Sequence, residues 1–203
     1  MIILIDKSNL DLECKALRAM FEARKRVFVD LLKWDLPVLA GRFEVDHFDD
    51  GAATYLIVSD PAGRHLASAR LLATTRPALL DSLYPDLVAG PMPRGADILE
   101  ITRFCLSPGI GAQMRRTARD TLLVGLAEYA LANSIRSYTG VAEQSWFEQI
   151  CTFGWDCRAL GTSRVHDGRL LTGLRIEIDD ETIGKLAAGG IGSGSHMPSA
   201  QAA

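Results

Sequence analysis

Charged residues that could do chemistry stand in the first half of this 203-residue sequence, at positions where composition alone would not place charge. They are three arginines and three carboxylates, namely Arg24, Arg70, Arg103, Asp46, Asp49 and Glu100. An isolated buried ion is strongly destabilising, so buried charges are paired. The set therefore predicts either a balanced charge cluster or ordinary salt-bridged surface charges, and the pattern alone leaves both open.

The elements that must position these residues follow from apolar periodicity. Strands are expected at residues 1–5, 54–59, 65–72, 97–106, 135–141, 155–160 and 170–178. Helices are expected at residues 9–31, 79–88, 113–133 and 144–152, with a short helix ending near Ala188. Ser8 or Asn9 is expected to cap the first helix, and residues 33–51 to form a long functional loop. This order predicts an α/β fold, a single-domain mixed sheet with helices on both faces in three α/β/α layers.

The overall composition excludes several classes of protein. Apolar residues make up 48% of the chain and charged residues 23%, and the formal net charge is −3. This balance is typical of a globular protein and gives no indication of a nucleic-acid or membrane partner. The apolar start Met1–Ile5 is short and is followed by Asp6 and Lys7, which predicts a strand and not a signal peptide. We therefore expect a cytoplasmic protein.

Cysteine and histidine spacing predicts no metal site. The cysteines and histidines are Cys14, Cys105, Cys151, Cys157, His47, His65, His166 and His196. Neither type clusters at the spacing that metal ligands have. The cysteines are interpreted as free thiols. The domain is expected to span residues 1–188. The Gly/Ser-rich tail at residues 189–203 contains Gly-Ser-His-Met, which resembles a cloning remnant, and is expected to have no function.

One ordered set of motifs resembles the acyl-homoserine lactone synthases, also called autoinducer synthases. The set is Arg24, Val27-Phe28, Trp34, Glu44-x-Asp46-x-x-Asp49, Tyr55, Arg70-Leu71-Leu72-x-Thr74-Thr75-x-Pro77 and Glu100-x-x-Arg103-Phe104. It covers about residues 18–106 closely. The second half matches in its plan of elements and in Phe153-Gly154-Trp155, and Tyr84 stands where the family usually has Phe.

The resemblance implies a fold like that of the N-acetyltransferases and a reaction in two steps. S-adenosylmethionine would be acylated on its amine by an acyl thioester, and its carboxylate would then close a lactone and release 5′-methylthioadenosine. S-adenosylmethionine is then a substrate, and no cofactor is expected. The second step needs only a folded-back substrate geometry, so no enzyme nucleophile is required.

The resemblance also implies roles for the charged and aromatic residues. The catalytic residues would be Glu100, as a general base or next to one, with Arg103 and Asp46. Substrate would be bound by Arg24, Phe28, Trp34, Asp46, Asp49, Arg70, Arg103 and Phe104. Strict alternation along a strand would put Glu100 and Arg103 on opposite faces, so we expect a bulge or splay nearby.

The second half would bind the acyl donor. The acyl-chain pocket is expected to include Ala142, Thr139 and Trp146, with Ala142 where makers of 3-oxo signals often carry Thr. Because Ala cannot donate a hydrogen bond, we expect an unsubstituted or 3-hydroxy chain. If this match to the family is shifted by three residues, Thr139 stands at that position and its hydroxyl can donate the hydrogen bond to a 3-oxo group. Arg115, Arg116 and Arg119 form either a docking patch for an acidic acyl carrier protein or a solvated face, and acyl-coenzyme A is the other candidate donor.

Two alternatives remain open from the sequence. One is an N-acetyltransferase acting on a different amine, which would use acetyl-coenzyme A and ignore S-adenosylmethionine. The other is a non-catalytic ligand-binding module on the same fold. The complete charged set argues against the second.

Overall fold

In the computed structural model, which describes residues 1–192, the chain forms two compact units. The first contains Met1–Arg70 and Arg103–Gly125, and the second contains Leu71–Thr102 and Leu126–Gly192. Three elements have residues in both units: strands β5 (His65–Ala73) and β6 (Ile98–Leu106) and helix α3 (Ala112–Ala132). Residues 193–203 of the expected tail lie outside the described residues.

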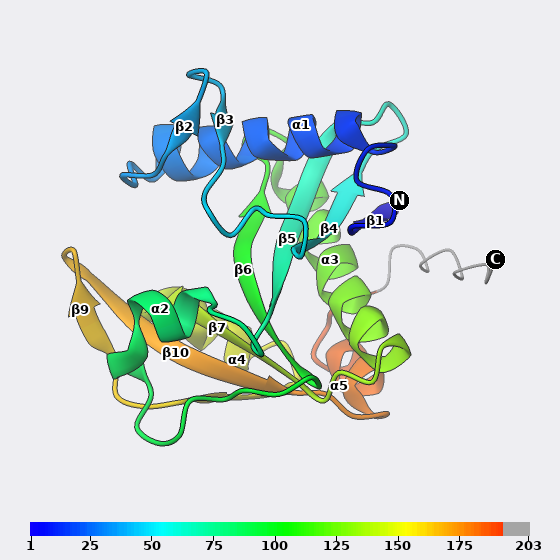
Figure 1. The fold of residues 1–203 in the computed structure, drawn as a ribbon. Coiled ribbons are helices and arrows are strands. Elements are labelled where there is room, and N and C mark those ends of the chain that lie inside the picture. The colour runs from blue at the N-terminus through cyan, green and yellow to red at the C-terminus, as the bar shows by residue number, and fades with distance from the viewer. Residues whose placement is uncertain (193–203) are drawn as a thin grey trace. The chain divides into compact units, whose positions relative to one another are not determined.

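The first unit has an antiparallel pair of strands, β1 (Ile2–Ile5) and β4 (Thr54–Ser59), with β5 on the other side of β4. Besides the first part of α3, its helical segment is α1 (Cys14–Arg24), continued by the π-helix η1 (Lys25–Leu31). A short hairpin of β2 (Val38–Leu39) and β3 (Phe43–Glu44) follows, and β3 packs against α1 (Figure 1). The expected long loop at residues 33–51 therefore contains a hairpin, whose two-residue strands are too short to show a period.

The start of the first helix was predicted wrongly. Residues 7–13 form turns, and α1 begins at Cys14. Asn9 does not cap it: its Nδ2 donates to the carbonyl of Leu4 at 2.9 Å, and its Oδ1 accepts from the N–H of Asp6 at 3.0 Å. Asn side chains can bond to nearby backbone groups instead of capping a helix, and Asn9 stabilises the turn in this way.

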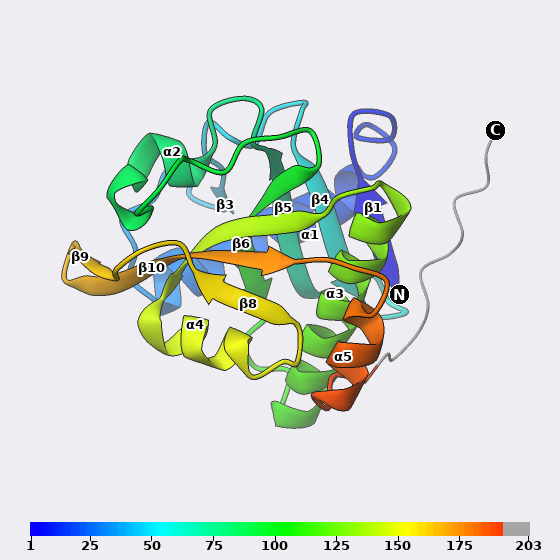
Figure 2. The same cartoon turned by 90° about the horizontal axis from the view of Figure 1, so that it is seen from below.

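The second unit is built on four neighbouring strands in the order β6, β7 (Ser137–Glu143), β10 (Arg169–Glu177) and β8 (Asp156–Ala159). β6 and β7 are parallel, and β10 is antiparallel to β7, to β8 and to β9 (Arg164–His166). The helical elements are α2 (Leu79–Leu83), the 3₁₀ turn η2 (Pro85–Leu87), α4 (Gln144–Cys151) and α5 (Thr182–Ala188). Figure 2 shows α4 along β8 and β10, against which it packs. The mixed α/β fold class is confirmed.

Most predicted boundaries agree with the structure to within two residues, from β1 to β10. The predicted helix at 79–88 is two pieces, because Pro85 starts a new turn after Leu83. Strand β9 was missed because it is three residues long. Within residues 1–192, no helix combines the length and apolar character that a bilayer crossing requires.

Candidate active site

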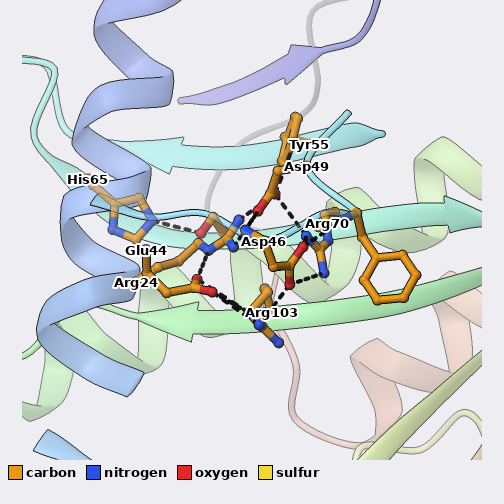
Figure 3. Close-up of polar contacts among 10 residues, drawn as sticks. Arg24, Glu44, Asp46, Asp49, Tyr55, His65, Arg70 and Arg103 are labelled. Carbon is orange, nitrogen blue, oxygen red and sulfur yellow. Dashed lines mark hydrogen bonds and ion pairs between the residues drawn. The ribbon is translucent and has the colours of Figure 1, made fainter. Parts of the chain in front are cut away.

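Three arginines and three carboxylates of the first unit form one ion-pair network (Figure 3). Arg24 holds Asp49 with two parallel hydrogen bonds of 2.8 Å and Glu44 through Nε at 2.5 Å. Arg70 donates to both oxygens of Asp46, at 2.6 and 3.1 Å, and pairs with Asp49 at 2.9 Å. Arg103 bridges Glu44 at 3.0 Å and Asp46 at 2.8 Å. The predicted buried cluster is therefore present, and three positive charges balance three negative charges.

The third carboxylate of this network was predicted wrongly. It is Glu44, which is fully buried, and not Glu100. Glu44 stands two residues before Asp46, and residues two apart in an extended segment point the same way. That spacing was the available signal in the sequence. Tyr55, also without an assigned role, donates its hydroxyl hydrogen to Asp49 at 3.1 Å.

The network has an inner part and an accessible edge. The side chains of Arg24, Glu44 and Asp49 have no exposed surface. Those of Arg103 and Asp46 are each 8% exposed. A ligand reaching this network from solvent would therefore meet Arg103 and Asp46 first, while the inner ions hold them in place.

The ion pairs fix the charges of the network. Burial raises the pKa of Asp46, but hydrogen bonds and charge from Arg70 outweigh it, so the pKa lies below its usual range. Burial opposes ionisation of Asp49 too, yet the bonds from Arg24 hold its pKa far lower. Burial also lowers the pKa of Arg24, and its bonds to Asp49 and Glu44 raise it overall. These groups keep their charges at neutral pH and are suited to binding charge, not to moving protons.

Aromatic rings border the edge of the network. The guanidinium carbon of Arg103 lies 5.7 Å from the ring centre of Phe28. Trp34 stacks on Phe28 with the ring centres 5.0 Å apart and the planes 15° from parallel. Phe28 packs with Ala23, Val27 and Cys105 in a buried cluster. Phe104, the next residue of β6 after Arg103, is partly buried.

Two backbone irregularities position these side chains. Arg24 ends α1, and Phe28 lies in the π-helix that follows, where the N–H of Leu32 bonds to the carbonyl of Val27. π-helical turns are rare and occur mostly at functional sites. Arg103 has a φ of 50°, a left-handed conformation unusual inside a strand. Burial alternates along β6 as far as Thr102 and then slips by one residue, so the strand is irregular at Arg103, where a bulge or splay was expected.

Glu100 lies in the second unit, in the part of β6 that pairs with β7. Its side chain is 1% exposed, and its carboxylate accepts two hydrogen bonds from the N–H of Leu80, at 2.9 and 3.1 Å. Thr139 is its register partner on β7. Both line a small pocket with space for about one water molecule, whose other lining residues are Thr74, Ala78, Leu80, Asp81, Met92, Pro93 and Arg94. We call this the Glu100 pocket.

The three residues expected around the acyl chain do not share one face of β7. Thr139 and Ala142 are three residues apart on the strand, so their side chains point to opposite sides. Ala142 pairs in register with Thr172. Trp146 of α4 contacts the ring of Phe153 edge-on, with the ring centres 5.8 Å apart.

The three arginines expected to form a docking patch have different surroundings in the first unit. Arg115 donates to the carbonyls of Leu106 and Ser107 at 3.1 and 3.2 Å. Arg119 is partly buried and pairs with Asp120 at 2.6 Å. Arg116 is exposed. Among the described residues, no three His, Cys, Asp or Glu side chains are grouped so that they could hold a metal ion.

Comparison with known proteins identifies the family. Residues 8–186 match the autoinducer synthase family. An acyl-homoserine-lactone synthase of Rhizobium etli is 32% identical over 177 residues, covering 86% of this chain and 83% of the relative. A second, from Ralstonia nicotianae, is 33% identical over 187 residues, with 89% of each chain covered.

Solved structures agree with these sequence relatives. MesI, a CoA-dependent acyl-homoserine lactone synthase, superposes with a TM-score of 0.83 at 30% identity, covering 95% of this chain and 96% of MesI. An N-acetyltransferase of Lactobacillus plantarum has a TM-score of 0.58 at 16% identity, covering 88% and 98% of the two chains, and shows the shared fold alone. Neither alternative function gains support. The chain belongs to the autoinducer synthases, and it is an acyl-homoserine lactone synthase, an enzyme that transfers an acyl group and forms a lactone.

Proposed function

We propose that this enzyme acylates the amine of S-adenosylmethionine from an acyl thioester and then closes the lactone, releasing 5′-methylthioadenosine. The observation that carries this is the buried network of three arginines and three carboxylates. S-adenosylmethionine carries an ammonium, a carboxylate and a sulfonium within a few bonds, so a site for it must offer both signs of charge. BjaI, a related synthase at 26% identity, has a solved structure with S-adenosylmethionine and isopentyl-CoA.

The edge of the network would bind the substrate, and its inner part would position the edge. Arg103 would hold the substrate carboxylate by bidentate hydrogen bonds. Asp46 would face the ammonium, since its lowered pKa keeps it charged. The inner residues of the network hold Arg103 and Asp46 in place through ion pairs; they are Arg24, Asp49, Glu44 and Arg70. We assign them positioning roles in binding.

The aromatic residues would shield the substrate. The Phe28–Trp34 stack beside Arg103 offers ring faces, which attract a cation such as a sulfonium and stack on adenine. Phe104 is assigned the same role because it follows Arg103 in β6. No cofactor is required by this scheme, since the sulfonium is itself the leaving group of the second step.

Glu100 would accept the proton that the amine loses as it attacks the thioester carbonyl, directly or through one water. Its pocket has space for about one water molecule. The N–H of Leu80 holds the carboxylate in one orientation. The second step, attack of the methionine carboxylate on the carbon next to the sulfonium, needs only the folded-back substrate that the network would hold.

For the acyl donor, we propose an acyl carrier protein that docks on the start of α3. Arg115 and Arg116 are the exposed members of the basic patch, and of the three arginines Arg115 and Arg119 contact neighbouring groups. The acyl chain would lie against the second unit, near Thr139 or near Ala142 and Trp146. Location in the cytoplasm, where carrier proteins and S-adenosylmethionine occur, is part of the same proposal.

The test is an assay of purified protein with S-adenosylmethionine and a panel of acyl thioesters on carrier protein and on coenzyme A. Mass spectrometry should find an acyl-homoserine lactone and 5′-methylthioadenosine in equal amounts. Omitting S-adenosylmethionine should abolish both products and leave the thioester intact. Thioester consumption with another amine, in the absence of S-adenosylmethionine, would contradict the proposal.

A further inference from the structure

Two of the four cysteines lie together in the second unit. Cys151 is the last residue of α4, and Cys157 is the second residue of β8. The thiol of Cys151 donates to the carbonyl oxygen of Cys157, with a distance of 3.8 Å between sulfur and oxygen. Both are free thiols, and α4 packs against β8 (Figure 2).

The turn between them is held in a defined shape. Gly154 has a φ of 99°, and a Cβ at this position would lie 2.2 Å from the carbonyl oxygen of Lys185, so only glycine fits. The indole Nε1 of Trp155 donates to the carbonyl of Ile150 at 3.1 Å. Phe153 and Trp155 are both buried. The cysteines are therefore brought together by the fold and not by chance motion of a loop.

The two thiols differ in exposure. Cys151 is exposed, whereas Cys157 is partly buried. Burial raises the pKa of Cys157, and the neighbouring charge of Cys151 and its hydrogen bond raise it further. Because Cys151 is the exposed thiol, an oxidant in solution reaches it first, and Cys157 is left to attack the oxidised sulfur of Cys151.

We propose that Cys151 and Cys157 are a modification site, a dithiol that hydrogen peroxide converts to a disulfide. In the first step the sulfur of Cys151 attacks one oxygen of the peroxide, giving a sulfenic acid and one water. In the second step the sulfur of Cys157 attacks the sulfenic sulfur, the S–S bond forms, and the hydroxyl leaves as water with the proton of Cys157. The two thiols together lose two electrons and two protons, and the peroxide is reduced to two waters.

The disulfide would join α4 to β8 and close the turn at residues 152–156. The rings of Trp146, Phe153 and Trp155 are in contact along this turn, with centre distances of 5.8 and 6.4 Å. Oxidation would therefore restrict motion of the turn that carries two of these rings. The proposal stands on the thiol geometry and does not depend on the catalytic assignment.

The experiment treats the full-length protein with a small excess of hydrogen peroxide, alkylates it with iodoacetamide and digests it. Trypsin cuts after Arg136 and Arg158, so one fragment, residues 137–158, contains both cysteines and no other. We expect this fragment unalkylated and lighter by two hydrogen atoms, and doubly alkylated if the protein is first reduced. Chymotryptic cleavage after Phe153 should then leave two peptides joined by the disulfide.

Matched variants separate this site from general thiol oxidation. Cys14, exposed and in the first unit, is the control: Cys14→Ser should leave the cross-link unchanged. Cys151→Ser and Cys157→Ser should each abolish it, and Cys157→Ser should let Cys151 advance to sulfinic acid. Wild-type protein in which Cys14 is oxidised while Cys151 and Cys157 both remain alkylatable would overturn the proposal. So would sulfinic acid at Cys151 beside a free Cys157, a result that needs no variant to fold.

Discussion

The charged network of the first unit and the Glu100 pocket of the second treat buried carboxylates differently. In the network, Glu44, Asp46 and Asp49 face guanidinium groups, and these hold the pKa of Asp46 and of Asp49 below its usual range. In the pocket, Glu100 accepts hydrogen bonds from a backbone N–H and lies beside space for water. Fixed charges suit binding of a zwitterionic substrate, and a carboxylate next to water suits proton transfer. The comparison predicts that mutations in the network reduce stability and substrate binding, whereas a mutation of Glu100 reduces turnover.

The largest effect is expected for Arg24→Ala. This change leaves Glu44 and Asp49 buried without their strongest partner, and breaking a buried ion pair costs about 3–5 kcal/mol. Urea denaturation should therefore show a large loss in the free energy of unfolding, with activity lost as well. Arg103→Ala, at the accessible edge, is the matched control and should lose activity with a smaller loss of stability. Equal losses of stability would contradict the division into an inner part and an edge.

The next effect separates catalysis from binding. Glu100→Gln keeps the shape and one acceptor for the N–H of Leu80, but removes the base. We expect turnover to fall by about 100-fold or more, as is typical for loss of a general base, with the Kd for S-adenosylmethionine nearly unchanged. Asp46→Asn should do the reverse, raising the Kd for S-adenosylmethionine more than it lowers turnover. Isothermal titration and steady-state rates measure both, and a parallel loss in Glu100→Gln would make Glu100 a binding residue.

A third prediction concerns an uncharged titratable group in the first unit. Burial lowers the pKa of His65 to about 3, with a smaller contribution from Arg26. Ser107 donates its hydroxyl hydrogen to the carbonyl of His65, so Nδ1 of His65 donates to Ser107 at 2.8 Å and Nε2 accepts from Ser68 at 2.9 Å. The folded state therefore holds the neutral ring in place.

The sign of the pH dependence follows from this. The unfolded chain protonates His65 below about pH 6.5, whereas the folded protein does so only near pH 3. Its contribution to stability is complete above about pH 6.5 and is lost at about 1.4 kcal/mol per pH unit as the pH falls toward 3. Asp46 and Asp49 act only at lower pH, because the unfolded chain protonates carboxylates below about pH 4. His65→Gln should flatten the slope between pH 6 and 4 in denaturant titrations, and an unchanged slope would contradict the prediction.

The sequence predicted what depends on local periodicity or on charge placed in apolar runs. Arg24, Arg70 and Arg103 were identified because guanidinium groups are costly inside apolar segments. Glu44 was missed because its partners are 20 and 59 residues away in the chain. The π-helix at Phe28 and the positive φ of Arg103 were not predicted either, because no motif in the local sequence indicates them. The expected bulge in β6 came from a conflict between alternation and the charged set, which was itself a usable signal.

A fourth prediction addresses the acyl chain in the second unit. Thr139 lines the Glu100 pocket, and Ala142 faces the other side of β7. Thr139→Val should therefore change selectivity for donors with oxygen at position 3 by about tenfold, the size expected for one lost hydrogen bond to a buried group. Ala142→Thr should leave the lactone profile as it is. If Ala142→Thr alone shifts the product toward 3-oxo lactones, the acyl chain lies on the Ala142 side of β7 and not on the Thr139 side.

The smallest effect on activity is expected for a surface charge, because salt in solution screens it. Arg116→Glu should raise the KM for an acyl-carrier-protein donor by a few-fold, since an exposed ion pair contributes only about 0.2–1 kcal/mol. The defect should grow at low ionic strength, because the Debye length increases as salt is removed. The KM for acyl-coenzyme A is the internal control, and the exposed Arg18→Glu on α1 is the matched charge reversal. Equal changes with both donors, or no dependence on salt, would leave this face of α3 as solvated surface.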